Sequence, residues 1–388
     1  MNFFLIIDII LFIIVTLFTA YDFFFTLASF IPRKKKIQSN IKQQSFAIIY
    51  VAYKEDKVII ESIENFLCQD YPKDKYQVIV VSDQMQDSTN QALSQLPIKL
   101  LIANFEQSMK HKSLTLALEE LRNFDKVIIM DADNITEINF LSRINEVTQN
   151  CKALQTHRTK KNDNTSIAIW DGIAEEINNT VFRKGHINIG LSAALIGSGM
   201  VFDFTWLKQN MKQCYTFAED KELELLLATQ NVFVDYANDI YVYDEKTSQK
   251  EILLRQRSRW FHAQILAFIS LIKDFNFKKF NFNYIDKCIQ WIPFPRPLRL
   301  ILIILLILIS GLISHSLAVK WCYLGIGTTL TYLLAIPKRM YTKDFLISIF
   351  KLPLLFIVLI KSYIASLYRV RNNDMRFNNT PHSITKDE

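Results

Sequence analysis

Glycine, proline and cysteine are all scarce in this 388-residue sequence, which contains 8 glycines, 9 prolines and 5 cysteines. With so few glycines, few backbone positions can adopt positive φ at low cost, and no fixed-period repeat or low-complexity tract is present. The cysteines lack Cys-x-x-Cys spacing, which argues against a zinc site and against a disulfide framework. We therefore expect reduced thiols, mostly buried, in the cytosol or the membrane. These cysteines are Cys68, Cys151, Cys214, Cys288 and Cys322.

Charge is unevenly placed. The net charge is +7, and the basic residues gather beside apolar segments, at residues 33–36, at Lys338 and Arg339, and at Arg369 and Arg371. This distribution is typical of a cytoplasmic membrane surface. No nucleic-acid-binding motif accompanies the charge, so we exclude nucleic acid as a partner. Half of the residues are hydrophobic and the mean hydropathy is +0.12, which indicates a polar domain joined to membrane segments.

Long apolar runs occur at both ends of the chain. Residues 1–32 are predicted to form an amino-terminal transmembrane anchor with its amino terminus outside, because the basic cluster follows the apolar run. Residues 276–297 are rich in aromatic residues, lysine and proline and suit a segment at the membrane interface. Residues 298–368 hold two spans and a third candidate, Phe345–Leu367; its hydrophobicity favours a crossing, whereas the arginines after it favour the cytoplasm. We favour the crossing, followed by a polar tail at 369–388.

The intervening residues 45–275 alternate short apolar runs with helical ones, which predicts an α/β domain with a sheet covered by helices. The expected strands are Phe46–Ala52, Gln77–Ser82, Ile98–Ile102 and Val127–Asp131, and the expected helices lie near Asp56–Leu67, Ser88–Leu96 and Ser113–Asn123.

Two carboxylates follow the last of these strands, Asp131 and Asp133. They lie at the carboxyl end of a buried strand, where open α/β sheets bind ligands. Carboxylates two residues apart suit Mg²⁺ or Mn²⁺ shared with the phosphates of a ligand. The alternative is a solvated turn.

Other candidate residues accompany this pair. Asp83 ends a second strand and could bond a pyrimidine or a ribose, or could be a turn residue; Tyr53 and Glu55 could frame a base. Glu219 and Asp220 begin a helix, where they could complement its dipole or supply a general base, for which Asp220 is favoured. Residues 255–260 read Arg-Gln-Arg-Ser-Arg-Trp; guanidinium groups bind phosphate and an indole stacks on a sugar, although a basic helix near a membrane is the competing interpretation.

With these residues together, the chain resembles membrane-embedded family 2 glycosyltransferases of the GT-A fold, a Rossmann-like mixed sheet flanked by helices; this group includes cellulose, hyaluronan and poly-N-acetylglucosamine synthases. The resemblance covers residues 46–264 and rests on Asp83, Asp131-x-Asp133, Glu219-Asp220 and Gln256-x-x-Arg259-Trp260. Departures are Lys54 within Tyr-Lys-Glu, glutamines at 84 and 86 in place of glycines, and Ala117 in place of an asparagine. The resemblance implies a role for each site residue. Asp133 and Asp131 bind the metal; Tyr53, Glu55, Asp83, Lys112 and Asp131 the nucleotide; Gln256, Arg257 and Arg259 the diphosphate; Gly197, Ser198, Glu219 and Trp260 the acceptor; and Gln155-Thr156 lies beneath the donor sugar.

The expected activity is an inverting, metal-dependent transfer of a hexosyl or N-acetylhexosaminyl group from a nucleotide-diphosphate sugar, most simply a UDP-sugar, with Asp220 as base. The expected acceptor is a growing polysaccharide, because Gln-x-x-Arg-Trp is typical of processive synthases. The alternatives are a single transfer to a lipid or lipid-linked sugar, and a catalytically inactive membrane scaffold of the same fold. We expect a multi-pass protein of the inner (cell) membrane with a cytoplasmic catalytic domain in contact with lipid, and a homo-oligomer or a partner membrane protein if a polymer is conducted.

Overall fold

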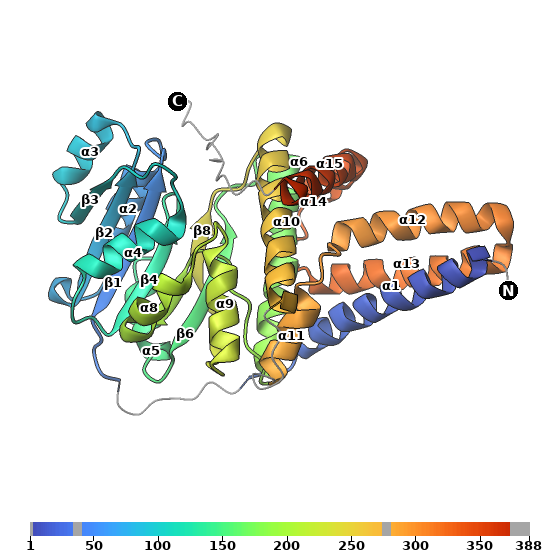
Figure 1. Cartoon of the computed structure of the whole chain (residues 1–388), viewed down its shortest axis with the longest axis horizontal. Coiled ribbons are helices and arrows are strands. Elements are labelled where there is room, and N and C mark those ends of the chain that lie inside the picture. The colour runs from blue at the N-terminus through green and yellow to red at the C-terminus, as the bar shows by residue number, and fades with distance from the viewer. Residues whose placement is uncertain (1–2, 34–40, 274–280, 373–388) are drawn as a thin grey trace.

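The protein consists of an α/β domain joined to a group of projecting helices (Figure 1). It is described here from a computed structural model, which covers residues 3–33, 41–273 and 281–372. Lys34–Lys36 of the expected basic cluster, residues 276–280 of the expected interfacial segment and residues 373–388 of the expected tail lie outside these ranges.

The α/β domain is built on an eight-stranded sheet in the order β3-β2-β1-β4-β7-β6-β8-β5. Strands β1 to β4 are parallel, β7 is antiparallel to both of its neighbours, and β6 and β8 are parallel to each other. The mixed sheet confirms the predicted α/β fold class. The strands are β1 Phe46–Tyr53, β2 Tyr76–Asp83, β3 Lys99–Ala103, β4 Lys126–Asp131, β5 Ile135–Thr136, β6 Ala153–Lys160, β7 Met200–Asp203 and β8 Val234–Asp244.

Successive side chains along the central strands point to opposite faces of the sheet, so two hydrophobic cores form, one on each face. In β1, Ala47 and Ile49 face one core, while Phe46, Ile48 and Tyr50 face the other. Because both faces are buried, the strand is apolar throughout. The second core is covered by α2 (Ile59–Leu67), α3 (Asp87–Ser94) and α5 (Phe140–Val147), and the first by α4 (Lys110–Glu120), α8 (Phe204–Asn210) and α9 (Glu219–Thr229).

Strand ends were predicted more closely than helix ends. Each of the four expected strands ends within one residue of its observed bounds, whereas α4 begins and ends three residues before the expected helix Ser113–Asn123. Leu121 leaves α4 in an extended conformation (ψ 145°) and is buried in the core, so burial of this side chain ends the helix.

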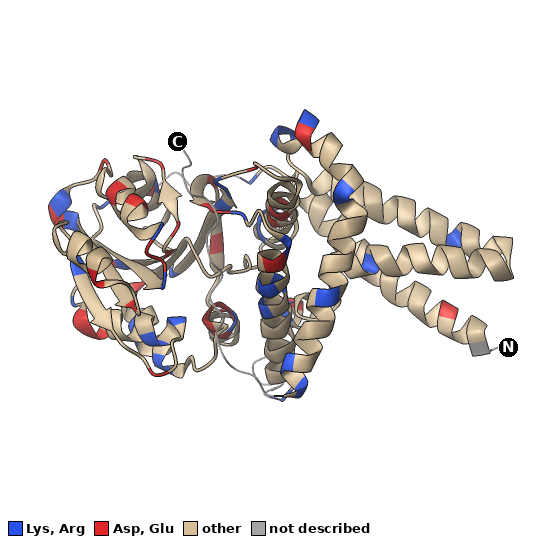
Figure 2. Ribbon diagram, turned by 90° about the horizontal axis from the view of Figure 1, so that it is seen from above, with Lys and Arg blue, Asp and Glu red and all other residues tan. Residues whose placement is uncertain are grey.

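The remaining helices lie beside the α/β domain and include those that project from it (Figure 1). Among the described residues, four segments are long and apolar enough to cross a membrane: Phe4–Ala28, Arg296–Ile313, His315–Ala335 and Lys343–Arg371. Helices α1, α12 and α13 run side by side away from the sheet, whereas α14 and α15 lie across the base of this bundle against α10 (Figures 1 and 2). Figure 2 shows few charged residues along the projecting helices. These elements are α1 Phe3–Ala28, α6 Ser166–Asn178, a π-helical turn Asn179–Gly185, α7 His186–Asn188, α10 Lys250–Lys273, α11 Phe282–Gln290, α12 Arg296–Ile313, α13 His315–Ala335, α14 Lys343–Ser348 and α15 Leu352–Arg371.

Close packing joins α1 to the α/β domain. A Cβ atom at Gly185 would lie 2.2 Å from the carbonyl oxygen of Phe25, so only glycine permits this approach of the π-helical turn to α1. Part of the expected interfacial segment, α11, instead packs on α9, where Lys287 and Glu224 form a buried ion pair at 2.6 Å. The base of the bundle is therefore fixed to the α/β domain.

Candidate active site

Parallel strands bring the first candidate residues to one edge of the sheet. Tyr53 pairs with Asp83 across β1 and β2, and Val51 pairs with Asp131 across β1 and β4. Strand β8, parallel to these strands through β6 and β7, ends at the same edge in Asp244. The carboxyl ends of separate strands thus place three acids together.

Asp83 is buried but incompletely bonded. Its side chain is 1% exposed and receives hydrogen bonds from Ser108 and from the backbone of Phe105. Burial raises the pKa of this carboxyl group, and its Oδ1 has no hydrogen-bond partner among the described residues. Asp83 lines the cavity described below, so this oxygen is available to a donor group of a ligand.

The loops after β1 and β2 hold two residues in a left-handed conformation, Lys54 (φ 56°) and Gln84 (φ 54°). Gln84 occupies a position where the resembled family has glycine, and a non-glycine residue there costs about 1–2 kcal/mol. The Lys54 N–H donates to the Asp83 carbonyl at 3.3 Å, which joins the loops. Both Tyr53 and Glu55 line the same cavity as Asp83.

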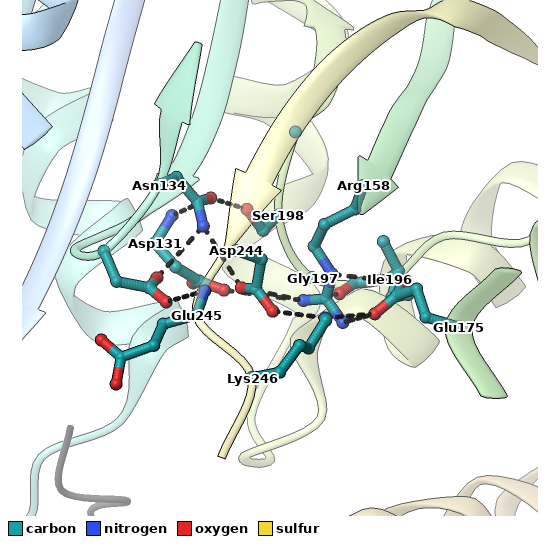
Figure 3. A network of polar contacts seen from close by, with 12 residues as sticks. Asp131, Asn134, Arg158, Glu175, Ile196, Gly197, Ser198, Asp244, Glu245 and Lys246 are labelled. Atoms are coloured by element: carbon teal, nitrogen blue, oxygen red, sulfur yellow. Dashed lines mark hydrogen bonds and ion pairs between the residues drawn. The ribbon is translucent and has the colours of Figure 1, made fainter. Parts of the chain in front are cut away.

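Asn134, a residue that the sequence analysis did not single out, bonds the backbone of Asp131 and the carboxylate of Asp133. Its side-chain oxygen accepts from the Asp131 N–H at 3.0 Å and from the Ser198 hydroxyl. Its amide donates to Asp133 at 3.1 Å. It also donates to Asp244 at 3.3 Å (Figure 3). Asn134 is fully buried.

The two aspartates differ in their surroundings. Asp133 is 4% exposed and accepts the Glu245 N–H at 2.9 Å, whereas Asp131 is about one-third exposed and pairs with Lys110. Both line the cavity. The described residues contain no group of three or more His, Cys, Asp or Glu side chains able to enclose a metal. The two carboxylates of Asp131 and Asp133 nevertheless fit Mg²⁺ or Mn²⁺, because these ions take one or two carboxylates and complete their coordination with phosphate oxygens and water.

Lys110, at the start of α4, is a site residue that the sequence did not predict. Its Nζ bonds Asp131 and the Gly197 carbonyl, the latter at 2.7 Å, and lies 3.7 Å from Glu219. Burial acts against its charge, but Asp131 and Glu219 raise the pKa of Lys110. The predicted residue, Lys112, donates to the Gln107 carbonyl at 2.8 Å and is absent from the described lining of the cavity. The observed start of α4 at Lys110 decides which of these two lysines lines the cavity.

Glu219 and Asp220 begin α9 and both line the cavity. Glu219 is 4% exposed, and burial raises its pKa to about 8, with the charges of Asp220 and Asp131 acting in the same direction. Lys110 opposes this shift but lies closer to Asp131, so we infer that Glu219 is protonated at neutral pH. Asp220 is more exposed and faces Gly197, whose hypothetical Cβ would lie 4.0 Å from the Asp220 Oδ2.

Helix α10 contributes Gln256, Arg257, Arg259 and Trp260 to the cavity lining. Burial lowers the pKa of Arg259, while Asp131, Glu219 and Glu55 stabilise its charge. Arg257 is paired with the buried Asp171 of α6 and stacks over Trp260 at 4.4 Å from the ring centroid. Arg259 therefore approaches the carboxylates at the strand ends, whereas Arg257 is held beside the tryptophan.

The loop before β7 has two glycines with positive φ, Gly197 (84°) and Gly199 (61°). Gln155 holds this loop by donating to the Ser198 carbonyl at 2.8 Å. A Cβ atom at Gly199 would lie 2.2 Å from the hydroxyl oxygen of Thr156. The two segments that the resemblance assigned to the donor sugar and the acceptor are thus in direct contact.

A buried ion network lies behind the aspartates and was also missed (Figure 3). Arg158 bonds Glu175 at 3.0 Å, and Lys246 bonds Glu175 at 2.8 Å and Asp244 at 2.7 Å. Burial works against ionisation of Glu175, but Arg158 and Lys246 lower its pKa well below the usual range. The network fixes the ends of β6 and β8. The sequence did offer one signal for this network: Asp244 ends β8 as Asp131 ends β4.

The strand-end acids, Lys110, the two acids of α9 and the four residues of α10 line one cavity of about 850 Å³. It begins at Asp83, Asp131 and Asp133 and continues past Asp220 and Trp260 to helices α1, α12, α13 and α15. Of the predicted site residues, Ser198 is fully buried beneath Asn134, and Lys112 lies outside the described lining.

Comparison with known proteins identifies a family and similar folds. The sequence model described as "Glycosyltransferase like family 2" matches residues 43–263, more than half of the chain. Among solved structures, the fold resembles a mannosyltransferase from Pyrobaculum calidifontis in complex with GDP-mannose and Mn²⁺, with a TM-score of 0.62, 14% identity and coverage of 94% of this chain and 99% of that one. A TarS structure from S. aureus with UDP-N-acetylglucosamine gives a TM-score of 0.45 at 16% identity, covering 85% of this chain and 92% of that chain. No curated protein matches.

Proposed function

This chain belongs to the glycosyltransferase family 2-like proteins, and on that premise we propose that it transfers a sugar from a nucleotide-diphosphate donor to a lipid-linked acceptor at the inner face of a membrane, with inversion at the anomeric carbon. One observation carries the proposal: the strand-end acids, Asp220 and Trp260 line a cavity that continues to the membrane-facing helices.

The donor binds at the edge of the sheet in this proposal. Asp83 offers an unpaired carboxylate oxygen to the nucleoside, beside Tyr53 and Glu55. Asp133 and Asp131 hold the divalent cation, which offsets the charge of the diphosphate when bound. The Mn²⁺ and GDP-mannose named for the P. calidifontis enzyme support a cation and a nucleotide sugar here, and a UDP-sugar is the first donor to test.

Asp220 acts as the general base. It removes the proton of the acceptor hydroxyl, whose oxygen forms a bond to the anomeric carbon while the bond to the diphosphate breaks. The leaving diphosphate takes the electron pair, and Arg259 and Lys110 stabilise its charge. A donor with an α-linkage gives a β-linked product.

The acceptor distinguishes this proposal from the polysaccharide synthase predicted from Gln256-x-x-Arg259-Trp260. Apolar side chains such as Leu333, Ile336 and Phe356 line the distant part of the cavity, which suits a lipid better than a hydrated glycan. Product length separates the two: membranes incubated with labelled donor should yield a single-sugar addition extractable into organic solvent. A water-soluble ladder of products contradicts the lipid acceptor.

We also propose the membrane topology. With the amino terminus outside, α1, α12 and α13 cross the membrane, and α14 and α15 lie on its inner surface, which replaces the favoured third carboxyl-terminal crossing. This arrangement leaves Arg369 and Arg371 in the cytoplasm, as the positive-inside rule requires, and turns exposed apolar residues such as Phe350 and Ile357 toward lipid. A reporter fused after Asn372 should lie in the cytoplasm. A reporter found outside would contradict this topology and favour the third carboxyl-terminal crossing.

Asp220→Asn tests the chemistry. It should abolish sugar transfer while nucleotide binding, followed by protection of the protein against heating, stays within about threefold of wild type. Full turnover by this variant contradicts the base assignment. Failure of the wild-type protein to release nucleoside diphosphate from any of a panel of nucleotide sugars with Mg²⁺ or Mn²⁺ and membrane lipids favours the inactive scaffold.

A further inference from the structure

The end of the cavity remote from the sheet contains a charged cluster at the base of the membrane helices. Asp22 of α1 accepts from Arg296 Nη2 at 3.1 Å and from Arg299 Nη2 at 2.9 Å, both at the start of α12. Tyr332 of α13 donates to the same carboxylate at 3.3 Å. All four residues line the cavity that contains Asp220.

The charges in this cluster do not balance. Two guanidinium groups face one carboxylate, which leaves one positive charge among apolar helices, where an uncompensated charge is costly. Arg296 uses its remaining Nη1 on the side-chain oxygen of Asn178 and packs over Phe182, with its Cζ 4.2 Å from the ring centroid. Arg296 is therefore satisfied by protein groups.

Arg299 also lies over a ring, with its Cζ 5.2 Å from the centroid of Phe18, but its hydrogen-bond donors are not all satisfied. It is 4% exposed, yet its Nε and Nη1 have no hydrogen-bond partner among the described residues. Such N–H groups stay buried at a substantial cost unless an acceptor occupies the adjacent space. Arg299 lines the cavity, where a ligand that carries oxygen acceptors and negative charge would supply the missing partners.

We propose that Arg299, positioned by Asp22 and supported by Arg296, binds the phosphate group that joins the lipid and the sugar of the acceptor. The hydrocarbon chain of the lipid lies among the apolar residues of the cavity, and the sugar reaches Asp220. Phosphate oxygens match the forked donors of arginine and supply the missing negative charge. The first turn of α12, which contains both arginines, adds the positive end of a helix dipole. Leu300 and Leu333 provide apolar surface beside the cluster.

This subsite rests on the proposed function, because it assigns the lipid of the acceptor. It is nevertheless testable without turnover. The full-length protein in detergent is titrated separately with farnesyl phosphate, with its uncharged analogue farnesol and with inorganic phosphate. Binding is measured by native mass spectrometry. The variants are Arg299→Gln and Arg299→Lys, and the control is Arg371→Gln, which removes the same charge from an exposed site at the end of α15 outside the described cavity lining.

The wild-type protein and Arg371→Gln should bind farnesyl phosphate about tenfold more tightly than farnesol, the size expected for hydrogen bonds to a charged group. Arg299→Gln should reduce this preference to less than twofold while farnesol binding is unchanged, which shows that the apolar cavity is still formed. Arg299→Lys should give an intermediate preference, because it keeps the charge but loses the fork.

Equal binding of the two lipids by wild type overturns the proposal, as does an undiminished preference in Arg299→Gln. Inorganic phosphate that displaces farnesyl phosphate at equal concentration overturns the lipid assignment in favour of a free anion. Phosphate preference without sugar transfer contradicts the proposed function alone, and transfer to a lipid without phosphate preference contradicts this subsite alone.

Discussion

Replacement of Glu219 by glutamine tests whether Glu219 and Asp220, the two adjacent acids of α9, have different roles. Burial raises the pKa of Glu219 to about 8, which favours its protonated form at pH 7 and makes it a poorer general base than Asp220. The introduced glutamine keeps the shape and the hydrogen-bonding capacity of the protonated acid. Glu219→Gln should therefore retain turnover within about tenfold of wild type at pH 7, whereas Asp220→Asn loses it.

The same substitution predicts a change in pH-dependent stability. Because burial raises the pKa of Glu219 above the unfolded value of about 4.3, the folded protein binds more protons between these two values. Its stability therefore falls as the pH rises through this window. The slope is about 1.4 kcal/mol per pH unit, which integrates to roughly 2 kcal/mol between pH 6 and pH 8. The glutamine side chain does not titrate, so the variant should be spared this loss.

Thermal unfolding of the detergent-purified protein, in buffer with a chelator, measures the difference. Between pH 6 and pH 8 the midpoint of wild type should fall by about 4–8 °C relative to that of Glu219→Gln. The control is Glu120→Gln, which removes an exposed carboxylate that pairs with Lys99 on the surface of the domain. Parallel wild-type and Glu219→Gln curves refute the raised pKa, and loss of turnover in Glu219→Gln to the level of Asp220→Asn refutes the division of roles.

Other predictions concern packing and backbone geometry. Gly185→Ala should lower the thermal midpoint and loosen α1 from the α/β domain, seen as faster protease cleavage, because its Cβ meets the Phe25 carbonyl; Gly327→Ala, with no atom within 4 Å of the new Cβ, is the control, and equal midpoints contradict the close contact. Gln84→Gly should keep or raise the midpoint, because it relieves about 1 kcal/mol of left-handed strain; a fall of several degrees contradicts this. Glu224→Gln should destabilise by roughly 3–5 kcal/mol, since it leaves the buried Lys287 without its carboxylate, and an unchanged unfolding curve counts against this pair.

The sequence predicted the central strands well because each is a short apolar run with a carboxylate or a turn at its end, a pattern that burial on both faces enforces. Asp83, Asp131 and Asp220 were predicted as site residues for the same reason, since each marks the end of a strand or the start of a helix, and all three line the cavity. Lys110 was missed because a helix start shifted by three residues changes which lysine faces the site. Arg158, Glu175 and Lys246 were missed because their pairing depends on strands and helices far apart in the chain.

The membrane segments show a different limit of sequence reasoning. Hydropathy identifies residues 343–371 as long enough to cross, but their orientation depends on packing against α10, which hydropathy does not describe. The conflict between an apolar segment and the arginines that follow it disappears if the helix lies on the inner surface, where its apolar face meets lipid and Arg369 and Arg371 stay in the cytoplasm.

The contacts between α1 and the catalytic domain connect this geometry to the proposed reaction. Gly185 brings the π-helical turn against Phe25, and Arg296 bridges Asp22 of α1 to Asn178 of α6. In the proposed topology these contacts fix the α/β domain against the helices that cross the membrane, so Asp220 is held at a constant depth relative to the bilayer. An acceptor anchored by its lipid at Arg299 then presents its sugar at a fixed distance from the base. We infer that selectivity for the acceptor depends on the length between phosphate and hydroxyl as much as on contacts with the sugar itself.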